Sequence, residues 1–192
     1  IILPEGSTFD QVIDTLQAND VLINYKAFRW VSKKKEYPEN IKPGRYLISQ
    51  GMNTNEVVNR LRAGIQEPLN VTFNNVRFKE ELAGKVSRYI EADSISILSL
   101  FSNSEKIREL GFTPETFKAM FIPNTYEFYW TTKAEEFADR MKAEYDKFWN
   151  DQRRGKAKKL GMTPVEVSIL ASIVREETNK SDELERVAGV YL

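Results

Sequence analysis

The N-terminal third of the chain combines short extended segments with helical periodicity. The opening "IILP" is typical of a strand, and Thr8 is suited to cap the helix that follows it. The apolar positions of this helix recur about every 3.6 residues: Phe9, Val12, Ile13 and Leu16. A second helix is predicted over 25–34, and "KPGRYLIS" predicts a turn at Pro43 and Gly44 before another strand. The order β-α-α-β is that of a small module.

The pattern then becomes mainly helical. A helix capped by Thr54 and stopped by Gly64 precedes a strand in "PLNVTF". Further helices are predicted over 78–90, 94–102, 113–120, 133–150, 164–178 and from about residue 181 onward. The predicted fold class is therefore α+β: a small βααβ module with an adjoining helix and strand over 1–70, then a mainly helical domain over 71–192.

Two of these helices have recognisable starts. Thr163 and Glu166 have the spacing of a full capping box, in which each side chain bonds the backbone N–H of the other residue. Thr113 is the expected cap of the 113–120 helix. It does not form a full box, because Thr116 stands where the box wants Glu or Gln.

Composition restricts the chemistry. Lys plus Arg equals Asp plus Glu at 28 each, so no global positive field draws in nucleic acid. The basic runs at 33–35 and 153–159 are typical of solvated helix ends. The chain has no His and no Cys, which excludes His general bases, Ser-His triads, thiol nucleophiles, and metal sites built on either residue. Catalysis would have to use Asp, Glu, Lys, Tyr, Ser or Thr.

The ends of the chain suggest a piece of a longer protein. No apolar run approaches the ~18 residues of a membrane span, and no signal peptide opens the sequence. The chain lacks an initiator Met and stops within the amphipathic "DELERVAGVYL". We therefore expect an excised fragment, from which an anchor could have been removed.

One carboxylate lies on an apolar helix face. At about 100° per residue, the 164–178 helix gathers five apolar side chains on one broad face: Val167, Ile169, Leu170, Ile173 and Val174. Glu177 falls near the middle of that face, and Glu176 falls at its edge. In one interpretation the helix emerges from the core here, and Glu177 points into solvent or pairs with Lys180 or with an Arg elsewhere in the chain. In the other, the apolar wall disfavours the charged carboxylate, as a general acid near neutral pH requires.

The segment "FIPNTYEFYW" at 121–130 also has two interpretations. Five of its residues are aromatic and surround a predicted Pro-Asn-Thr turn. They could fill part of the hydrophobic core below a loop. They could also form a sugar platform, since pyranose rings present C–H faces that lie on aromatic rings. In that case Asn124 and Thr125 would bond hydroxyl and acetamido groups beside Tyr126.

Together these segments resemble one family. "FIPNTYEFYW" is similar to its F-x-P-[DN]-T-Y element, and "LASIVREET" to its A-S-[IL]-[IV]-x-x-E-T helix. "DELERVAGVYL" resembles the E-x-x-x-V-A-x-V-[FY] helix that comes next. The N-terminal "LPEGSTFDQVIDTL" and "KPGRYLISQGMNTNEVVNRLRAG" resemble its LysM-like module. The family is that of the YceG-like (MltG) endolytic murein transglycosylases, and the order of the motifs agrees over essentially the whole chain.

The resemblance implies a specific activity. The family cleaves the β-1,4 bond after N-acetylmuramic acid in nascent peptidoglycan strands and leaves a 1,6-anhydro end. The catalytic Glu of its E-T pair corresponds to Glu177, which the helical wheel selects separately. A residue two positions earlier is often Glu in the family and is Arg175 here, on the polar side of the helix. A lytic transglycosylase needs one carboxyl group and no water, metal or organic cofactor, whereas hydrolytic glycosidases usually use two carboxylates.

Further expectations follow from the resemblance. The LysM-like module would occupy 1–70, and 71–192 would be the N-terminal portion of the catalytic domain. One N-terminal helix would anchor the full-length protein in the cytoplasmic membrane, with the catalytic domain on its outer side. Peptidoglycan strands would be the substrate, peptidoglycan synthases are candidate partners, and nucleic acid is not expected to bind.

The family continues past "VYL", so the chain is expected to be incomplete. Its last helix would leave apolar surface exposed and self-associate, and its cleft around Glu177 would be open.

Two other functions were considered. A pyridoxal-phosphate lyase lacks support, because no Gly-rich phosphate loop lies near a suitable Lys. A non-catalytic LysM-like glycan- or partner-binding module is the alternative.

Overall fold

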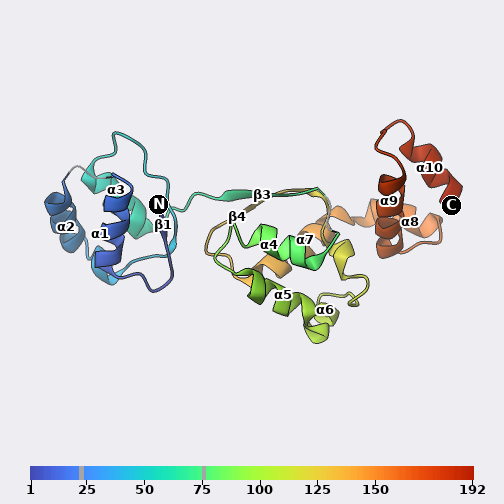
Figure 1. Ribbon diagram of the computed structural model, residues 1–192, viewed down its shortest axis with the longest axis horizontal. Coiled ribbons are helices and arrows are strands. Elements are labelled where there is room, and N and C mark those ends of the chain that lie inside the picture. Colours follow the sequence, from blue (N-terminus) through green and yellow to red (C-terminus); the bar gives the residue numbers. More distant parts are fainter. Residues whose placement is uncertain (22–23, 75–76) are drawn as a thin grey trace. The chain divides into compact units, whose positions relative to one another are not determined.

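The computed structural model describes residues 1–21, 24–74 and 77–192. Its elements, most of them labelled in Figure 1, are β1 (Ile2–Leu3), α1 (Phe9–Ala18), α2 (Tyr25–Lys34), η1 (Tyr37–Glu39), β2 (Gly44–Arg45), α3 (Thr54–Ala63), β3 (Leu69–Phe73), α4 (Lys79–Val86), α5 (Ser94–Ser102), α6 (Ser104–Glu109), η2 (Phe117–Met120), β4 (Asn124–Phe128), α7 (Ala134–Phe148), α8 (Asp151–Lys159), α9 (Pro164–Glu177) and α10 (Leu184–Tyr191).

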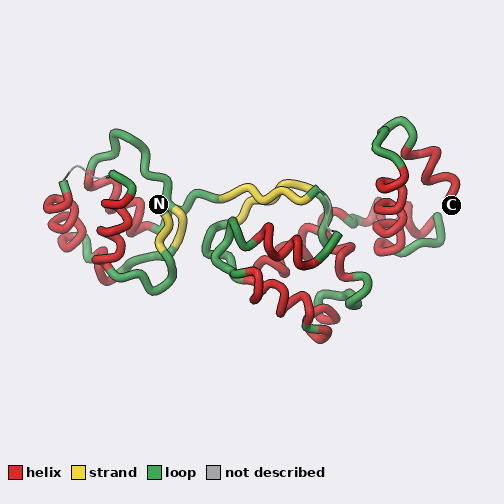
Figure 2. Tube along the Cα trace, viewed as in Figure 1, coloured by secondary structure: helices red, strands yellow, loops and turns green. Residues whose placement is uncertain are grey.

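The fold is mainly helical α+β, as predicted, with two small two-stranded sheets in the described residues (Figure 2). One sheet pairs β1 with β2, and the other pairs β3 with β4. None of the helices seen in the described ranges is both long and apolar enough to cross a bilayer.

The chain folds as two compact units that exchange segments. The first consists of residues 1–72, 83–96 and 125–134, and the second of residues 73–82, 97–124 and 135–192. The predicted division into a LysM-like module over 1–70 and a partial catalytic domain over 71–192 stays a prediction.

The first unit has a closed apolar core between its short sheet and α1, α2 and α3. β1 and β2 pair antiparallel, with Ile2 opposite Arg45 and Leu3 opposite Gly44. The fully buried side chains of this core are Leu3, Val12, Ile13, Leu16, Phe28, Tyr37, Tyr46, Val57, Val58 and Leu61. Burial raises the pKa of Tyr46 to about 12, and its hydroxyl donates to the Lys42 carbonyl oxygen (2.9 Å). The apolar positions that the sequence predicted for α1 face this core, with Phe9 packed against its margin.

An ionic cluster connects distant segments of the same unit. The Lys133 ammonium pairs with Glu5 and with Glu91 Oε2 (3.1 Å to the latter), and the Glu5 backbone N–H donates to Glu91 Oε1 (3.2 Å). The Lys133 ammonium lowers the pKa of Glu5, and the two carboxylates raise the pKa of Lys133. These groups hold the loop after β1 to the segments that follow α4 and β4.

An aromatic cluster forms part of the core of the second unit. The ring centroids of Phe101 and Phe117 lie 4.8 Å apart, those of Phe117 and Phe121 lie 5.2 Å apart, and Phe121 stacks on Phe137 at 6.2 Å. All four side chains are buried. For Phe121, the first residue of "FIPNTYEFYW", the core interpretation of that segment is confirmed.

Two predicted helices are shorter than expected. The 78–90 helix is observed only over α4, and Phe78 lies outside it with 60% of its surface exposed. After Val86 the chain continues in tighter turns, in which the Tyr89 N–H donates to the Val86 carbonyl (2.9 Å). The Glu91 N–H then bonds the Trp130 carbonyl oxygen (2.5 Å), so a tertiary contact replaces the last predicted turn.

The 113–120 helix is a turn followed by the short 3₁₀ helix η2. The Thr113 N–H donates to Thr116 Oγ1 (2.9 Å), and the Thr116 N–H donates to Thr113 Oγ1 (3.3 Å). These two bonds reproduce the reciprocity of a capping box with Thr in place of Glu. The prediction that Thr54 caps α3 is wrong by one residue: the cap is Asn53, in a full box with Glu56.

Candidate active site

The helix that carries Glu177 begins at the predicted capping box. The Thr163 N–H donates to Glu166 Oε2 (2.6 Å), and the Glu166 N–H donates to Thr163 Oγ1 (3.2 Å). Pro164 takes the first helical position, where its missing N–H costs no hydrogen bond. The bond from the Thr163 N–H lowers the pKa of Glu166. Local sequence therefore determines where α9 begins.

The apolar face of α9 is only partly covered. Val174 is its one buried residue, whereas Ile169 and Ile173 are 45% and 41% exposed. Glu177 is the last residue of the helix and is exposed. The apolar wall expected around Glu177 is therefore open to solvent in the described residues.

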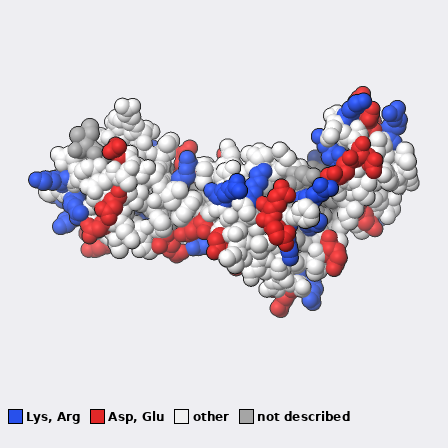
Figure 3. Space-filling model, in the orientation of Figure 1, with Lys and Arg blue, Asp and Glu red and all other residues white. Residues whose placement is uncertain are grey.

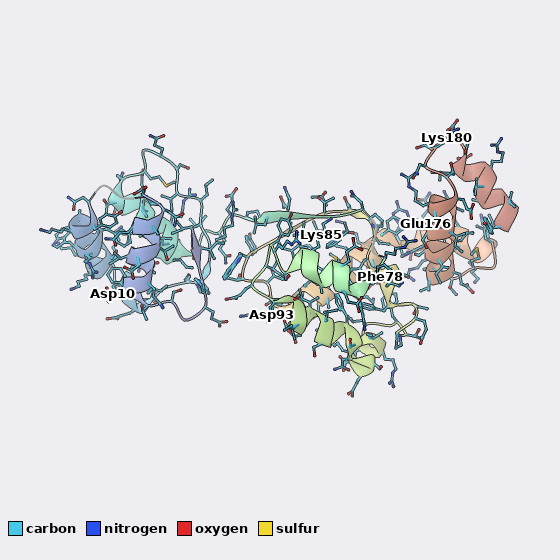
Figure 4. All side chains as sticks on the ribbon, viewed as in Figure 1. Asp10, Phe78, Lys85, Asp93, Glu176 and Lys180 are labelled. Carbon is cyan, nitrogen blue, oxygen red and sulfur yellow. The ribbon has the colours of Figure 1, made fainter. Side chains whose placement is uncertain are left out.

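A buried Thr fixes the turn that follows. Thr178 donates its own N–H to the Val174 carbonyl (3.2 Å) and its hydroxyl to Glu183 Oε2 (2.9 Å). The same hydroxyl oxygen accepts the Lys180 N–H (3.1 Å). Lys180, labelled in Figure 4, also pairs through Nζ with Glu183 Oε1 (3.3 Å). The Thr of the E-T pair thus organises the turn from which α10 returns to pack on α9.

The two neighbouring carboxylates have different surroundings. The Tyr191 hydroxyl, from the last residue of α10, donates to Glu177 Oε1 at 3.4 Å. Glu176, labelled on α9 in Figure 4, instead forms a long ion pair with Arg77 (3.9 Å). Glu177 is thus an accessible carboxyl group beside one phenol, an arrangement that can donate and accept a proton. The sequence analysis missed this contact, because no helical spacing connects residues 14 positions apart across a turn.

The aromatic segment forms a strand in place of the predicted turn. In β4 the side chains of Asn124 and Thr125 are exposed, whereas Tyr126 and Phe128 are buried. Thr125 Oγ1 lies 2.8 Å from Thr72 Oγ1, and the two hydroxyls form a hydrogen bond. The burial of the Tyr126 ring fits the core interpretation of this part of the segment.

The predicted site residues fall in both compact units. Thr125 and Tyr126 belong to the first, and Asn124 and Glu177 belong to the second. Their assembly into one cleft stays a prediction. No group of three or more His, Cys, Asp and Glu side chains suited to a metal ion occurs among the described residues.

Comparisons with known proteins agree with the sequence motifs. The model of the YceG-like family matches residues 1–192. The chain is 22% identical over 216 aligned positions to an endolytic murein transglycosylase of Streptococcus pneumoniae serotype 2, with 98% of this chain and 39% of that protein covered. The crystal structure of a YceG-like protein from Listeria monocytogenes superposes with a TM-score of 0.56 at 20% identity, over 94% of this chain and 64% of that one.

These matches concern part of a longer architecture, since the chain spans about two-fifths of the length of the streptococcal relative. At 20% identity the structural likeness shows the fold. The family match extends over the entire chain, including the helix that ends at Glu177. The chain belongs to the YceG-like family.

Proposed function

We propose that the natural full-length protein is an endolytic peptidoglycan lytic transglycosylase with Glu177 as its general acid and base. The enzyme would cleave the β-1,4 bond between N-acetylmuramic acid and N-acetylglucosamine and leave 1,6-anhydro ends. The observation that carries this proposal is the E-T pair at the end of a capped helix, in a chain of the YceG-like family. A relative that aligns with 98% of the chain bears the name endolytic murein transglycosylase.

One carboxyl group suffices for both proton transfers. Glu177 donates its proton to the glycosidic oxygen as the bond from that oxygen to C1 of N-acetylmuramic acid breaks. The C6 hydroxyl of the same sugar attacks C1, and the Glu177 carboxylate takes the hydroxyl proton. The acid is thereby regenerated, and no water is consumed. The exposed position of Glu177 supports this role, because a polymer must reach the carboxyl group.

Other segments would bind the glycan. Asn124 and Thr125 present exposed side chains at the start of β4 and would bond sugar hydroxyl and acetamido groups. Tyr126 remains a candidate substrate-binding residue, and its buried ring would hold these two in place. A LysM-like module over 1–70 would bind the glycan strand together with the partial catalytic domain. The full-length protein would be anchored in the cytoplasmic membrane with its catalytic part outside, near peptidoglycan synthases.

The test compares two adjacent carboxylates in the natural full-length protein. Purified peptidoglycan is digested, and the muropeptides are analysed by mass spectrometry for anhydro ends. Glu177→Gln preserves shape at a helix end and should lower turnover by at least about 100-fold, the scale of general acid catalysis. Glu176→Gln is the matched control and should keep near wild-type turnover. Reducing-end products without anhydro sugars contradict the reaction, and an active Glu177→Gln variant contradicts the assigned residue.

A second candidate is a glycan-binding module without catalysis. The exposed apolar face of α9 favours it for the 192-residue chain, because the wall around Glu177 is not closed. The alternative is supported if the 192-residue chain sediments with peptidoglycan and neither it nor the full-length protein releases anhydro ends.

A further inference from the structure

The helix α2 carries a basic, aromatic face that the proposed function does not use. Its inner side is buried at Phe28 and Ser32. At about 100° per residue, the residues on its outer side form one continuous strip: Lys26, Trp30, Lys33 and Lys34, all exposed. We refer to these four residues as the α2 face. Trp30 is 60% exposed and is the one exposed Trp of the described residues.

The charge of this face is not neutralised locally. The sequence from residue 25 to residue 35 contains no acidic residue. Arg29, at the margin of the face, pairs with Asp10 at 3.0 Å. Within the part of the chain that the structure describes, no carboxylate pairs with Lys26, Lys33 or Lys34. Figure 3 shows Lys and Arg side chains gathered over the outer edge of α2.

The indole and the ammonium groups are close together. Lys34 Nζ lies 4.3 Å from the centroid of the Trp30 ring. Indole rings favour the headgroup level of a bilayer, where an apolar ring and a polar N–H are both accommodated. Lysines beside such a ring can bury their methylene stems while each ammonium stays among phosphate groups. Clusters of lysines attract anionic headgroups, and Trp is enriched at membrane–water interfaces.

We propose that the α2 face docks on a membrane surface rich in anionic phospholipids. The attraction is electrostatic, with three lysines facing anionic headgroups, and insertion of the Trp30 ring adds a short-range apolar contact. Single-stranded nucleic acid is the less favoured occupant, because its sites stack successive bases on several aromatic side chains, whereas the α2 face has Trp30 alone. The proposal does not depend on the proposed transglycosylase activity.

A second basic helix provides a matched control. On α8 the exposed residues Lys156, Lys158 and Lys159 carry the same charge as the three lysines of the α2 face. α8 contains no aromatic residue. If binding required only positive charge, the two helices would contribute equally.

The test is sedimentation of the 192-residue chain with vesicles of phosphatidylglycerol and phosphatidylcholine, or of phosphatidylcholine alone. We expect binding only to the anionic vesicles, weakened by high salt. The triple variant Lys26→Gln, Lys33→Gln, Lys34→Gln should lower the partition coefficient by about 100-fold, the factor that three lysines imply at an anionic surface. Trp30→Ala should lower it several-fold, and the triple variant Lys156→Gln, Lys158→Gln, Lys159→Gln should leave it unchanged.

Thermal midpoints check that each variant folds, which surface substitutions of this kind preserve. Equal binding to both vesicle types overturns the proposal, as does an equal loss of binding from the α8 variant. Binding of single-stranded RNA through Lys26, Lys33 and Lys34 without binding to anionic vesicles also overturns it, and assigns the face to a polyanion.

Discussion

The helices α1 and α9 begin in the same way and pack in different ways. Each starts at a Thr that exchanges two hydrogen bonds with the third residue of its helix, Gln11 in α1 and Glu166 in α9. α1 then buries its apolar residues Val12, Ile13 and Leu16 in a closed core. α9 buries Val174 alone. Local signals therefore determine where a helix begins, whereas other segments determine whether its apolar face is covered.

The difference lies in what each helix meets. The apolar residues of α1 share one core with buried side chains from β1, α2 and α3, which close the core of the first unit. α9 packs on α8, α10 and η2, and these neighbours leave Ile169 and Ile173 exposed. The apolar face of the helix that carries Glu177 is thus less completely buried than that of α1.

Core truncation should give the largest contrast between the two helices. Leu16→Ala should lower the free energy of unfolding by about 2–5 kcal/mol, because it leaves a cavity in a closed core. Ile173→Ala should cost less than about 1 kcal/mol, because its side chain already contacts solvent. Urea unfolding followed by circular dichroism measures both. Equal losses would show that α9 is as deeply packed as α1.

Substitution of the helix caps should have a smaller effect and tests the corrected start of α3. Asn53→Ala removes the side chain that accepts the Glu56 N–H (3.1 Å) and should cost about 1 kcal/mol. Thr54→Ala, one residue later, should change stability by less than about 0.5 kcal/mol. The same unfolding assay compares them, and a larger loss at Thr54 would restore the original prediction from the sequence.

The smallest effect concerns pH. In α9 the capping box uses a carboxylate whose pKa is lowered by the Thr163 N–H, whereas α1 uses the neutral amide of Gln11. Because the folded pKa of Glu166 lies below its ordinary value of 4.5, this contribution is fully present above that value. It is lost as pH falls through the lowered pKa.

The amide proton signals of Thr163 and Thr8 report these two boxes in an acid titration by nuclear magnetic resonance. The Thr163 signal should shift with acidification below the ordinary Glu range. The bond from the Thr8 N–H to Gln11 should cause no such shift in the Thr8 signal, because the Gln11 amide does not titrate. Glu166→Gln is the control and should abolish the Thr163 titration. A titration that persists in this variant would assign it to another carboxylate.

Much of the fold could be predicted because its signals are local. The bounds of α2 agree with the predicted 25–34 helix, and Gly64 ends α3 in the left-handed conformation that favours glycine. The prediction for 78–90 failed where the backbone of Glu91 bonds Trp130, a partner 39 positions away in the sequence. The strand β4 likewise depends on β3, so the local aromatic pattern at 121–130 did not reveal it.

The candidate site was predictable to a lesser extent. The wheel placed Glu177 on the apolar side of α9, but periodicity cannot tell whether a second segment covers that side. The role of Thr178 in the turn and the approach of Tyr191 both depend on how α10 returns. Such contacts arise from tertiary packing and leave no periodic signal in the sequence.

Hydrogen exchange of the backbone amides tests the contrast between α1 and α9 most directly. Amides in α1 should exchange only through opening of the closed core, whereas those in the last turns of α9 and in α10 should exchange orders of magnitude faster through local opening. Protection of α9 and α10 equal to that of α1 in the 192-residue chain would contradict the account, because it would show that the helix carrying Glu177 is held by a core as complete as the first.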